Sequence, residues 1–267
     1  MKKMKERLEI DEVMALHLLG MSVREIINCD LDKFEQLLES DPDLNNLLNK
    51  ANNILDRQEA LGIVSISCQD ERYPKMLVDI GPDAPTVIHC LGNVDLLKEG
   101  KAVAIIGARA ADKEGNTKAY QLGKEYAEKG YVIVSGLALG CDTSAHIGCL
   151  DTGGKTIAIV GNGLDLIHPK ENVDLQKRIL DNGGLILSEQ KLGVKANPTR
   201  LVARNRLQAA LSQTVILAQC PIKSGSLYTM EFARKYEKQS LAAVFSHRTE
   251  ANAGNFFLID NNLALPI

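Results

Sequence analysis

Six short apolar runs alternate with helix-forming stretches from residue 102 onward, and this alternation limits the folds open to the chain. Each run is apolar throughout, which is typical of a strand covered on both faces. Strands alternating with helices in this way predict right-handed crossovers and an α/β fold with a doubly wound, mostly parallel sheet. The predicted strands are 102–106, 131–135, 156–160, 185–188, 214–218 and 240–245. The predicted helices are about 113–129, 142–151, 172–182, 201–212 and 226–238.

The first 62 residues have a different pattern, which predicts a small helical module ahead of the sheet. Apolar residues recur there at helical spacing, and Asp41-Pro42 supplies a helix start. A short strand at 63–68 follows, and then a proline-punctuated connector that includes the apolar run 87–91. We therefore predict a domain boundary after residue 62.

Composition excludes several classes of protein. The 45% hydrophobic and 24% charged fractions are ordinary for a chain that buries a core. No apolar run reaches the roughly 18 residues of a membrane span, and the charged N-terminus lacks the apolar core of a secretory signal. We expect a cytoplasmic protein without membrane contact. The six cysteines contain no C-x-x-C pair, which argues against a zinc site, and a reducing compartment argues against disulfides. Cys141 and Cys149 are predicted to be buried small side chains.

The net charge of −3 argues against a generally basic nucleic-acid binder, but the cations are unevenly distributed. Between Glu189 and Glu231 the sequence has no carboxylate. The same stretch holds six cations, namely Lys191, Lys195, Arg200, Arg204, Arg206 and Lys223. Such a basic stripe is typical of a surface that follows a phosphate backbone. A solvated loop and helix face is the alternative interpretation.

The ends of the predicted strands carry glycine and serine, which predicts an anion site at one edge of the sheet. In open parallel sheets ligands bind at the carboxyl ends of the strands, where glycine lets backbone N–H groups approach and helix N-termini favour negative charge. Tight turns alone would also explain any single glycine. The predicted phosphate-binding residues are Gly107, Arg109, Ser135, Gly136, Gly140, Asp142, His146, Gly161, Gly163, Arg200, Arg204, Asn205, Arg206, Lys223, Ser224, Gly225 and Ser226.

The sequence shows no catalytic constellation. Asp142 and His146 share a helix face at i, i+4 spacing, but no nucleophile is specified beside them, so an N-cap with a nearby polar contact is favoured over a dyad. Gly154-Lys155-Thr156 is similar to the end of a P-loop, yet it leads into a strand rather than a helix. The first predicted strand lacks a G-x-G-x-x-G continuation, which argues against NAD. We predict neither a metal nor a cofactor.

The order of the motifs resembles the bacterial DNA-processing protein DprA (Smf) family over about residues 66–260. The resemblance rests on the segments 103–109, 134–146, 153–172, 187–189, Ala203-Arg-Asn-Arg206 and Ser224-Gly-Ser-Leu-Tyr-Thr229. It implies a Rossmann-like domain over 63–267 that binds single-stranded DNA without catalysis, usually as a homodimer. It also implies that the protein protects incoming DNA in natural transformation and loads the RecA recombinase.

The sequence departs from the family pattern at three positions. Leu139 stands where the family usually has arginine, Cys141 stands where it has isoleucine, and Leu201-Val202 stands where Phe-Pro usually precedes the R-N-R segment. A base-stacking aromatic residue typically contributes about 1–3 kcal/mol per base, so its loss predicts weaker binding of single strands. We expect no C-terminal winged-helix domain, which many members carry. The alternative function is binding of a nucleotide or nucleotide-derived ligand by a sensor of the same superfamily.

Overall fold

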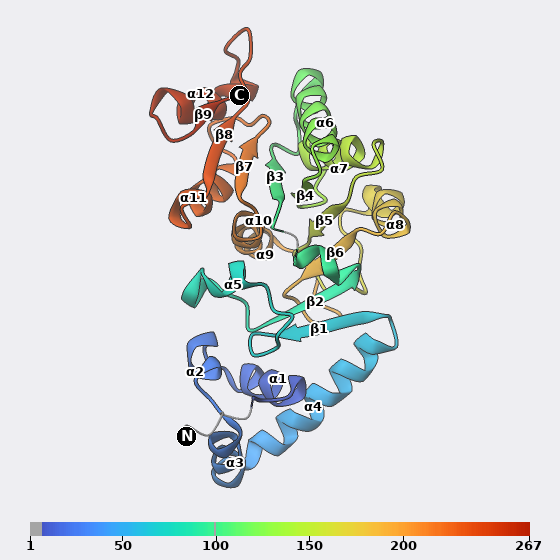
Figure 1. Ribbon diagram of the computed structural model, residues 1–267, viewed down its shortest axis with the longest axis vertical. Coiled ribbons are helices and arrows are strands. Elements are labelled where there is room, and N and C mark those ends of the chain that lie inside the picture. The colour runs from blue at the N-terminus through green and yellow to red at the C-terminus, as the bar shows by residue number, and fades with distance from the viewer. Residues whose placement is uncertain (1–6, 99) are drawn as a thin grey trace.

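The computed structural model describes residues 7–98 and 100–267, and Figure 1 shows how their elements are arranged. The chain begins with α1 (Ile10–Leu19), α2 (Val23–Ile27), α3 (Leu31–Ser40) and α4 (Pro42–Glu59). The start of α4 confirms the predicted signal, because the Asp41 carboxylate accepts the Asp43 N–H and Pro42 occupies the first turn. The predicted boundary after residue 62 falls between α4 and the first strand, and a separate domain there stays a prediction.

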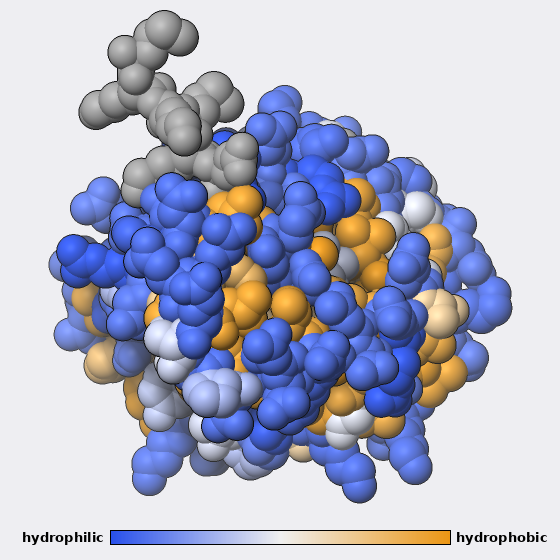
Figure 2. Space-filling view, turned by 90° about the horizontal axis from the view of Figure 1, so that it is seen from below, coloured by the Kyte–Doolittle hydropathy of each residue, from blue (hydrophilic) through white to orange (hydrophobic). Residues whose placement is uncertain are grey.

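The four N-terminal helices share one hydrophobic cluster. Its most deeply buried members include Val13, Leu16, Ile26 and Leu44, and Val87 from the sheet belongs to the same cluster. The helices therefore pack against the sheet as well as against one another. Figure 2 shows the molecule from this end, where hydrophilic side chains cover most of the surface and hydrophobic ones appear in separate spots between them.

A nine-stranded sheet runs through the rest of the described chain in the order β1-β2-β6-β5-β4-β3-β7-β8-β9. The strands are β1 (Ile63–Ser67), β2 (Val87–Gly92), β3 (Ala102–Ile106), β4 (Val132–Ser135), β5 (Thr156–Ile159), β6 (Leu185–Ser188), β7 (Thr214–Leu217), β8 (Gln239–Ala242) and β9 (Leu265–Pro266). β3 to β9 pair in parallel, whereas β2 is antiparallel to both β1 and β6. The predicted Rossmann-like α/β fold is confirmed.

The predicted connector is wrong for residues 87–92, which form β2 inside the sheet. His89 of β2 lies opposite Ser65 of β1 and Ser188 of β6. The prolines that suggested a connector lie before the strand, where Pro82 is in the short helix η1 (Gly81–Asp83) and Pro85 precedes β2. Because β1 and β2 extend the sheet, they bring it into contact with the N-terminal helices (Figure 1).

Helices cover both faces of the parallel strands (Figure 1). Val103 and Ile105 of β3 pack with α6 and α7, while Ala104 and Ile106 pack with α10 and α11. This alternation is what a strand covered on both faces requires. The helices are α5 (Lys75–Val78), α6 (Lys113–Glu128), α7 (Cys141–Leu150), α8 (Val173–Asp181), α9 (Pro198–Ala203), α10 (Asn205–Ala210), α11 (Ser226–Lys235) and α12 (Ala253–Asp260). The remaining short helices are η2 (Val94–Leu97), η3 (Lys170–Asn172) and η4 (Glu250–Asn252).

The helix predicted at 201–212 is two helices, α9 and α10. The first starts three residues early, because the Asn197 side chain accepts the Arg200 N–H and Pro198 occupies the first turn. All six cysteines are free, and Cys141 and Cys149 are buried as predicted. Within the described ranges, no helix is long and apolar enough to cross a membrane.

The order of the strands reverses in the middle of the sheet. From β3 the chain proceeds through β4 and β5 to β6, and it then returns to β7, which lies on the other side of β3. The connections that leave β3 and β7 therefore diverge at the carboxyl edge of the sheet. Such a switch point opens a crevice in which ligands of doubly wound folds bind.

Candidate anion-binding site at the strand ends

Two adjoining cavities lie at the switch point. The first has a volume of about 420 Å³ and is lined by the segments that follow β3 and β7. It brings together nine predicted residues, namely Gly107, Arg109, Asp142, Arg204, Asn205, Lys223, Ser224, Gly225 and Ser226. The second has a volume of about 450 Å³ and shares Arg109 and Leu201 with the first, and Gly136 and Gly161 complete its predicted lining. We call the two cavities together the strand-end pocket.

Gly107 is required at the end of β3 by close packing. A Cβ atom at this position would lie 2.6 Å from Cys141 Cβ and 2.8 Å from the carbonyl oxygen of Gln219. The next residue ties the switch point together, because Ala108 N donates to Gln219 O at 2.7 Å and Cys141 N donates to Ala108 O at 3.2 Å. The end of β3, the end of β7 and the start of α7 therefore form one rigid unit below Arg109.

The loop between β4 and α7 is held in an uncommon conformation. Leu137 has φ 57°, a left-handed value that is strained for a leucine. The Asp142 carboxylate accepts N–H groups from both neighbours of this residue, Gly136 at 3.1 Å and Ala138 at 3.3 Å. Asn172 Nδ2 donates to Leu137 O at 2.8 Å. These bonds fix the loop against the pocket.

The predicted N-cap role of Asp142 is wrong. The N-cap of α7 is Gly140, which has φ 77° and no side-chain cap. Its backbone lies so close to the Ala108 and Arg109 carbonyls that a Cβ atom would overlap them. The Asp142 carboxylate instead turns back toward the preceding loop, so it organises the loop rather than the helix.

Arg204 lies beneath this loop as the buried partner of Asp142. The two side chains are 5% and 7% exposed, with Arg204 Nη2 3.7 Å from Asp142 Oδ2 and donating to Gly136 O at 3.0 Å. Burial raises the pKa of the Asp142 carboxyl, and the Arg204 charge opposes that rise. A Cβ atom on Gly136 would overlap the guanidinium. Arg204 therefore supports the wall of the pocket from behind.

The start of α11 supplies the other wall. Its N-cap is Gly225, so no N-cap side chain caps this helix. Asn205 Nδ2 donates to Gly225 O at 3.2 Å, and Ser226 N donates to Ser224 Oγ at 3.3 Å. Leu227 N also donates to Ser224 O at 3.1 Å, so Ser224 accepts the first N–H groups of α11, and the helix dipole is the feature that favours an anion. Arg109 and Lys223 add two cations to the same cavity.

Six predicted residues lie outside the lining of the strand-end pocket, and two of them, Arg200 and Arg206, line another cavity. The other four are buried in or packed against the surrounding fold. Ser135 is buried, and its hydroxyl donates to Ile105 O at 2.7 Å. Gly140 makes the close backbone packing described above. His146 is fully buried against Thr156, with Nδ1 2.7 Å from the Thr156 hydroxyl, and burial lowers the pKa of its ring to about 3. Gly163 packs against the backbone of Lys191 and Leu192. These residues support the fold around the site.

The basic stretch between Glu189 and Glu231 does not form one stripe. Arg204 is buried with Asp142, and Arg206 forms a two-bond ion pair with Glu189 at 2.8 Å and 2.5 Å. Arg200 and Arg206 line a different cavity, at the N-terminal helices. Arg204 and Lys223 line the strand-end pocket, and only Lys223 of the two is exposed. Both arginine pairs involve carboxylates outside the acid-free stretch, which a count along the sequence does not reveal.

Aliphatic side chains occupy the two positions where the sequence departs from the family pattern. Leu139 is 38% exposed and lines the second cavity, and Leu201 lines both. Sequence reasoning missed His168 and Lys170, which also line the second cavity. Their signal was the segment His168-Pro-Lys, which follows the third predicted strand.

The fold and this pocket define a Rossmann-like protein with an anion site at the switch point of its sheet. A family model for DNA recombination-mediator protein A matches residues 64–267, and the chain belongs to that family. DNA processing protein DprA of Streptococcus pneumoniae is 46% identical over 169 residues, which are 63% of this chain and 58% of that relative. The chain therefore matches little more than half the length of this relative.

Two solved structures have the same fold. The X-ray structure of DNA processing protein A from Streptococcus pneumoniae has a TM-score of 0.79 at 31% identity and covers 98% of this chain and 95% of its own. A structure of DNA processing protein A from Helicobacter pylori, which concerns its single-stranded DNA binding mode, has a TM-score of 0.69 at 35% identity. That match covers 77% of this chain and 90% of the other. The first match includes the N-terminal helices, because it covers nearly the whole chain.

Proposed function

We propose that the protein binds single-stranded DNA in the strand-end pocket. The observation that carries the proposal is the convergence of Arg109, Lys223 and the N-terminus of α11 on one crevice at the switch point. These groups bind phosphate without reading a base, which suits a strand of any sequence. The relationship to DNA processing protein A of Helicobacter pylori, whose single-stranded DNA binding mode has been examined, supports the same ligand.

The wider role that we propose follows from the family. The protein protects incoming DNA in the cytoplasm during natural transformation and helps to load the RecA recombinase, as a homodimer and without catalysing a reaction. None of the residues that line the strand-end pocket forms a nucleophile–base pair within the described chain, and His146 is buried away from the pocket. A RecA pull-down with and without single-stranded DNA, and the mass of the protein in solution, test the two assembly steps.

Fluorescence anisotropy with labelled oligo-dT tests DNA binding. The affinity should fall steeply as salt rises, because phosphate contacts release counterions. Arg109→Ala and Lys223→Ala should each weaken binding and lower the salt slope by about 0.7, the value for one phosphate of a single strand. Lys50→Ala is the matched control, because Lys50 is exposed on α4 and outside the pocket. An equal loss in the control, or no binding at low salt, would contradict the proposal.

A mononucleotide is the second candidate ligand for this pocket. The cavity beside Gly161 has a volume of about 450 Å³, within the usual range for small-molecule sites, and Leu139, Val160 and Leu201 give it an apolar wall. A sensor would be stabilised by one mononucleotide and not by oligo-dT, which a thermal-shift comparison measures. Loss of that stabilisation in Arg109→Ala would place the nucleotide in the strand-end pocket.

A further inference from the structure

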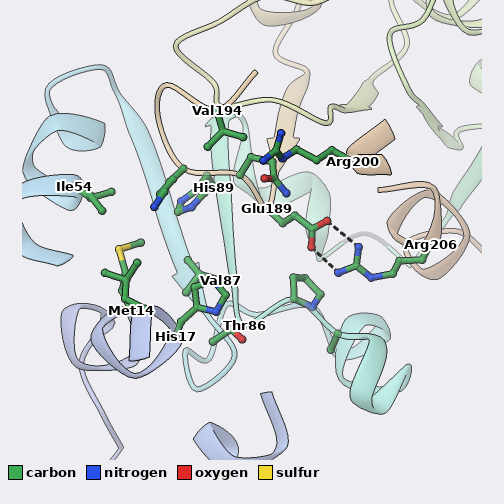
Figure 3. A pocket seen from close by; sticks show the side chains of 15 residues that line it. Met14, His17, Ile54, Thr86, Val87, His89, Glu189, Val194, Arg200 and Arg206 are labelled. Atoms are coloured by element: carbon green, nitrogen blue, oxygen red, sulfur yellow. Dashed lines mark hydrogen bonds and ion pairs between the residues drawn. The ribbon is translucent and has the colours of Figure 1, made fainter. Parts of the chain in front are cut away.

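A separate cavity of about 380 Å³ lies where the N-terminal helices meet the sheet (Figure 3). Its walls come from α1 and α4, from the start of β2, from the loop after β6 and from α9. We call it the junction cavity, and Met14, Ile54, His89, Glu189 and Arg200 mark its extent. Its size is within the range of pockets that hold small ligands.

The junction cavity has an apolar side and a charged side. Met14 and Ile54 lie on the side of the N-terminal helices, whereas Arg200 and Arg206 lie on the opposite side (Figure 3). Leu18 adds to the apolar side. A cavity of this kind fits a ligand with an apolar portion at one end and a charged group at the other.

The charge balance of the junction cavity favours an anion. Glu189 and Arg206 neutralise each other through two hydrogen bonds, and their side chains are mostly buried. Lys191 and Arg200 have no ion-pair partner among residues 7–98 and 100–267, although Arg200 Nη1 donates to Lys195 O at 3.1 Å. The lining therefore carries two uncompensated positive charges, which a phosphate group would neutralise.

His89 places a polar ring nitrogen in the wall. Its Nδ1 lies 2.9 Å from the Ser65 hydroxyl, which also lies 2.9 Å from Gln58 Oε1. These contacts hold the ring, and no group in the described ranges bonds to Nε2. His89 is 3% exposed, and burial lowers the pKa of its ring to about 4, so the ring is neutral at pH 7. A polar group of a ligand can hydrogen-bond to Nε2, which acts as donor or acceptor according to the tautomer.

We propose that the junction cavity binds a nucleoside phosphate. Its base lies among Met14, Leu18 and Ile54 and hydrogen-bonds to His89 Nε2, and its phosphate contacts Lys191 and Arg200. The same unit can come from a free mononucleotide or from a strand that continues past α9 from the strand-end pocket. Only the second source rests on the proposed binding of DNA.

Two variants of the full chain test the proposal. Lys191→Ala removes an exposed cation, and Leu18→Trp fills the apolar side. Calorimetric titration with dAMP and dTMP, and anisotropy with short and long oligo-dT, are measured for both variants. Arg109→Ala serves as the control for the strand-end pocket and Lys50→Ala as the control for general loss of charge. Thermal melting shows whether Leu18→Trp is folded, and Lys191→Ala decides the question if it is not.

A free nucleotide as the ligand predicts that mononucleotide affinity falls about tenfold or more in Lys191→Ala and disappears in Leu18→Trp, with no change in Lys50→Ala. A loss confined to Arg109→Ala would place the nucleotide in the strand-end pocket and overturn the proposal. A strand nucleotide predicts no mononucleotide binding, and a loss of affinity in both variants for long but not for short oligo-dT. The proposal is overturned if neither variant changes binding of a mononucleotide or of long oligo-dT. A wild-type chain that binds mononucleotides but no oligo-dT would contradict the proposed function and leave the cavity proposal standing.

Discussion

The strand-end pocket and the junction cavity lie along the same edge of one sheet but are assembled in different ways. The strand-end pocket depends on close backbone packing, because Gly107 and Gly136 leave no room for a Cβ atom, and its lining includes the start of α11. The junction cavity is built from side chains that come from α1, α4, β2 and the loop after β6. The first site follows from the topology of a doubly wound sheet, whereas the second requires the N-terminal helices to dock.

Two arginines from one short segment show the same difference. Arg204 is buried in the wall of the strand-end pocket and faces Asp142, while Arg206 lines the junction cavity and pairs with Glu189. The side chains of the second pair are 16% and 15% exposed, so water still reaches them. Burial therefore sets how much each pair matters for folding.

The largest expected effect comes from Arg204→Ala. The change leaves the Asp142 carboxylate buried without its partner, and we expect the free energy of unfolding to fall by about 3–5 kcal/mol. Arg206→Ala should lower it by less, about 1–3 kcal/mol, because solvent reaches Glu189. Urea unfolding measures both variants. The double change Asp142→Asn with Arg204→Met should recover part of the loss. Equal effects of the two single arginine variants would contradict the claim that burial sets how much each ion pair stabilises the fold.

Gly136→Ala should have the next largest effect. The added methyl group would overlap the Arg204 guanidinium, and overpacking of this kind lowers the free energy of unfolding by about 1–3 kcal/mol. Gly225→Ala is the matched control, because its φ of −59° suits alanine and no atom lies within 4 Å of the added Cβ. The control should change stability by less than about 0.5 kcal/mol. Thermal and urea unfolding measure the stability of both variants. Equal stabilities of Gly136→Ala and Gly225→Ala would contradict the packing argument.

The smallest expected effect is the change in stability per pH unit. Burial lowers the pKa of His146 in the strand-end region to about 3 and that of His89 in the junction cavity to about 4. Both values lie below the roughly 6.5 of an unfolded histidine, so the unfolded chain binds more protons as the pH falls. Each histidine therefore contributes its full stability above pH 6.5 and loses about 1 kcal/mol per pH unit below it.

Urea unfolding at pH 7, 6 and 5 measures this dependence. Between pH 6.5 and about 4, His89→Gln should reduce the slope of stability against pH. His146→Gln should reduce the slope between pH 6.5 and about 3. A slope that neither variant changes would show that other groups cause the acid sensitivity.

Much of the fold was predictable from the sequence, because each buried strand is a local apolar run. The predicted bounds of β3 and β6 are those of the structure. β2 was missed because its two partners, β1 and β6, lie far apart in the sequence and prolines precede it. A short run beside prolines carries no sign of the strand that will pair with it.

The site was predictable only where it depends on the ends of strands. Gly107, Arg109 and Ser226 lie together because parallel strands share one carboxyl edge. The direction of a side chain at a helix junction is not local, so Arg204 and Arg206 were assigned to one surface although they face different cavities. His89 gave no signal, because its role depends on Ser65 and Gln58 packing behind it.

Helix α9 has only six residues, and it belongs to both regions. Leu201 lines the strand-end pocket, and Arg200, one residue earlier, lines the junction cavity. On the proposals above, an occupant that displaces this helix from one side alters the cavity on the other. Linkage requires the effect to be reciprocal, so the factor by which a nucleotide changes DNA affinity equals the factor by which DNA changes nucleotide affinity. This short helix would thereby make the occupancy of the DNA-binding pocket depend on the concentration of a nucleotide.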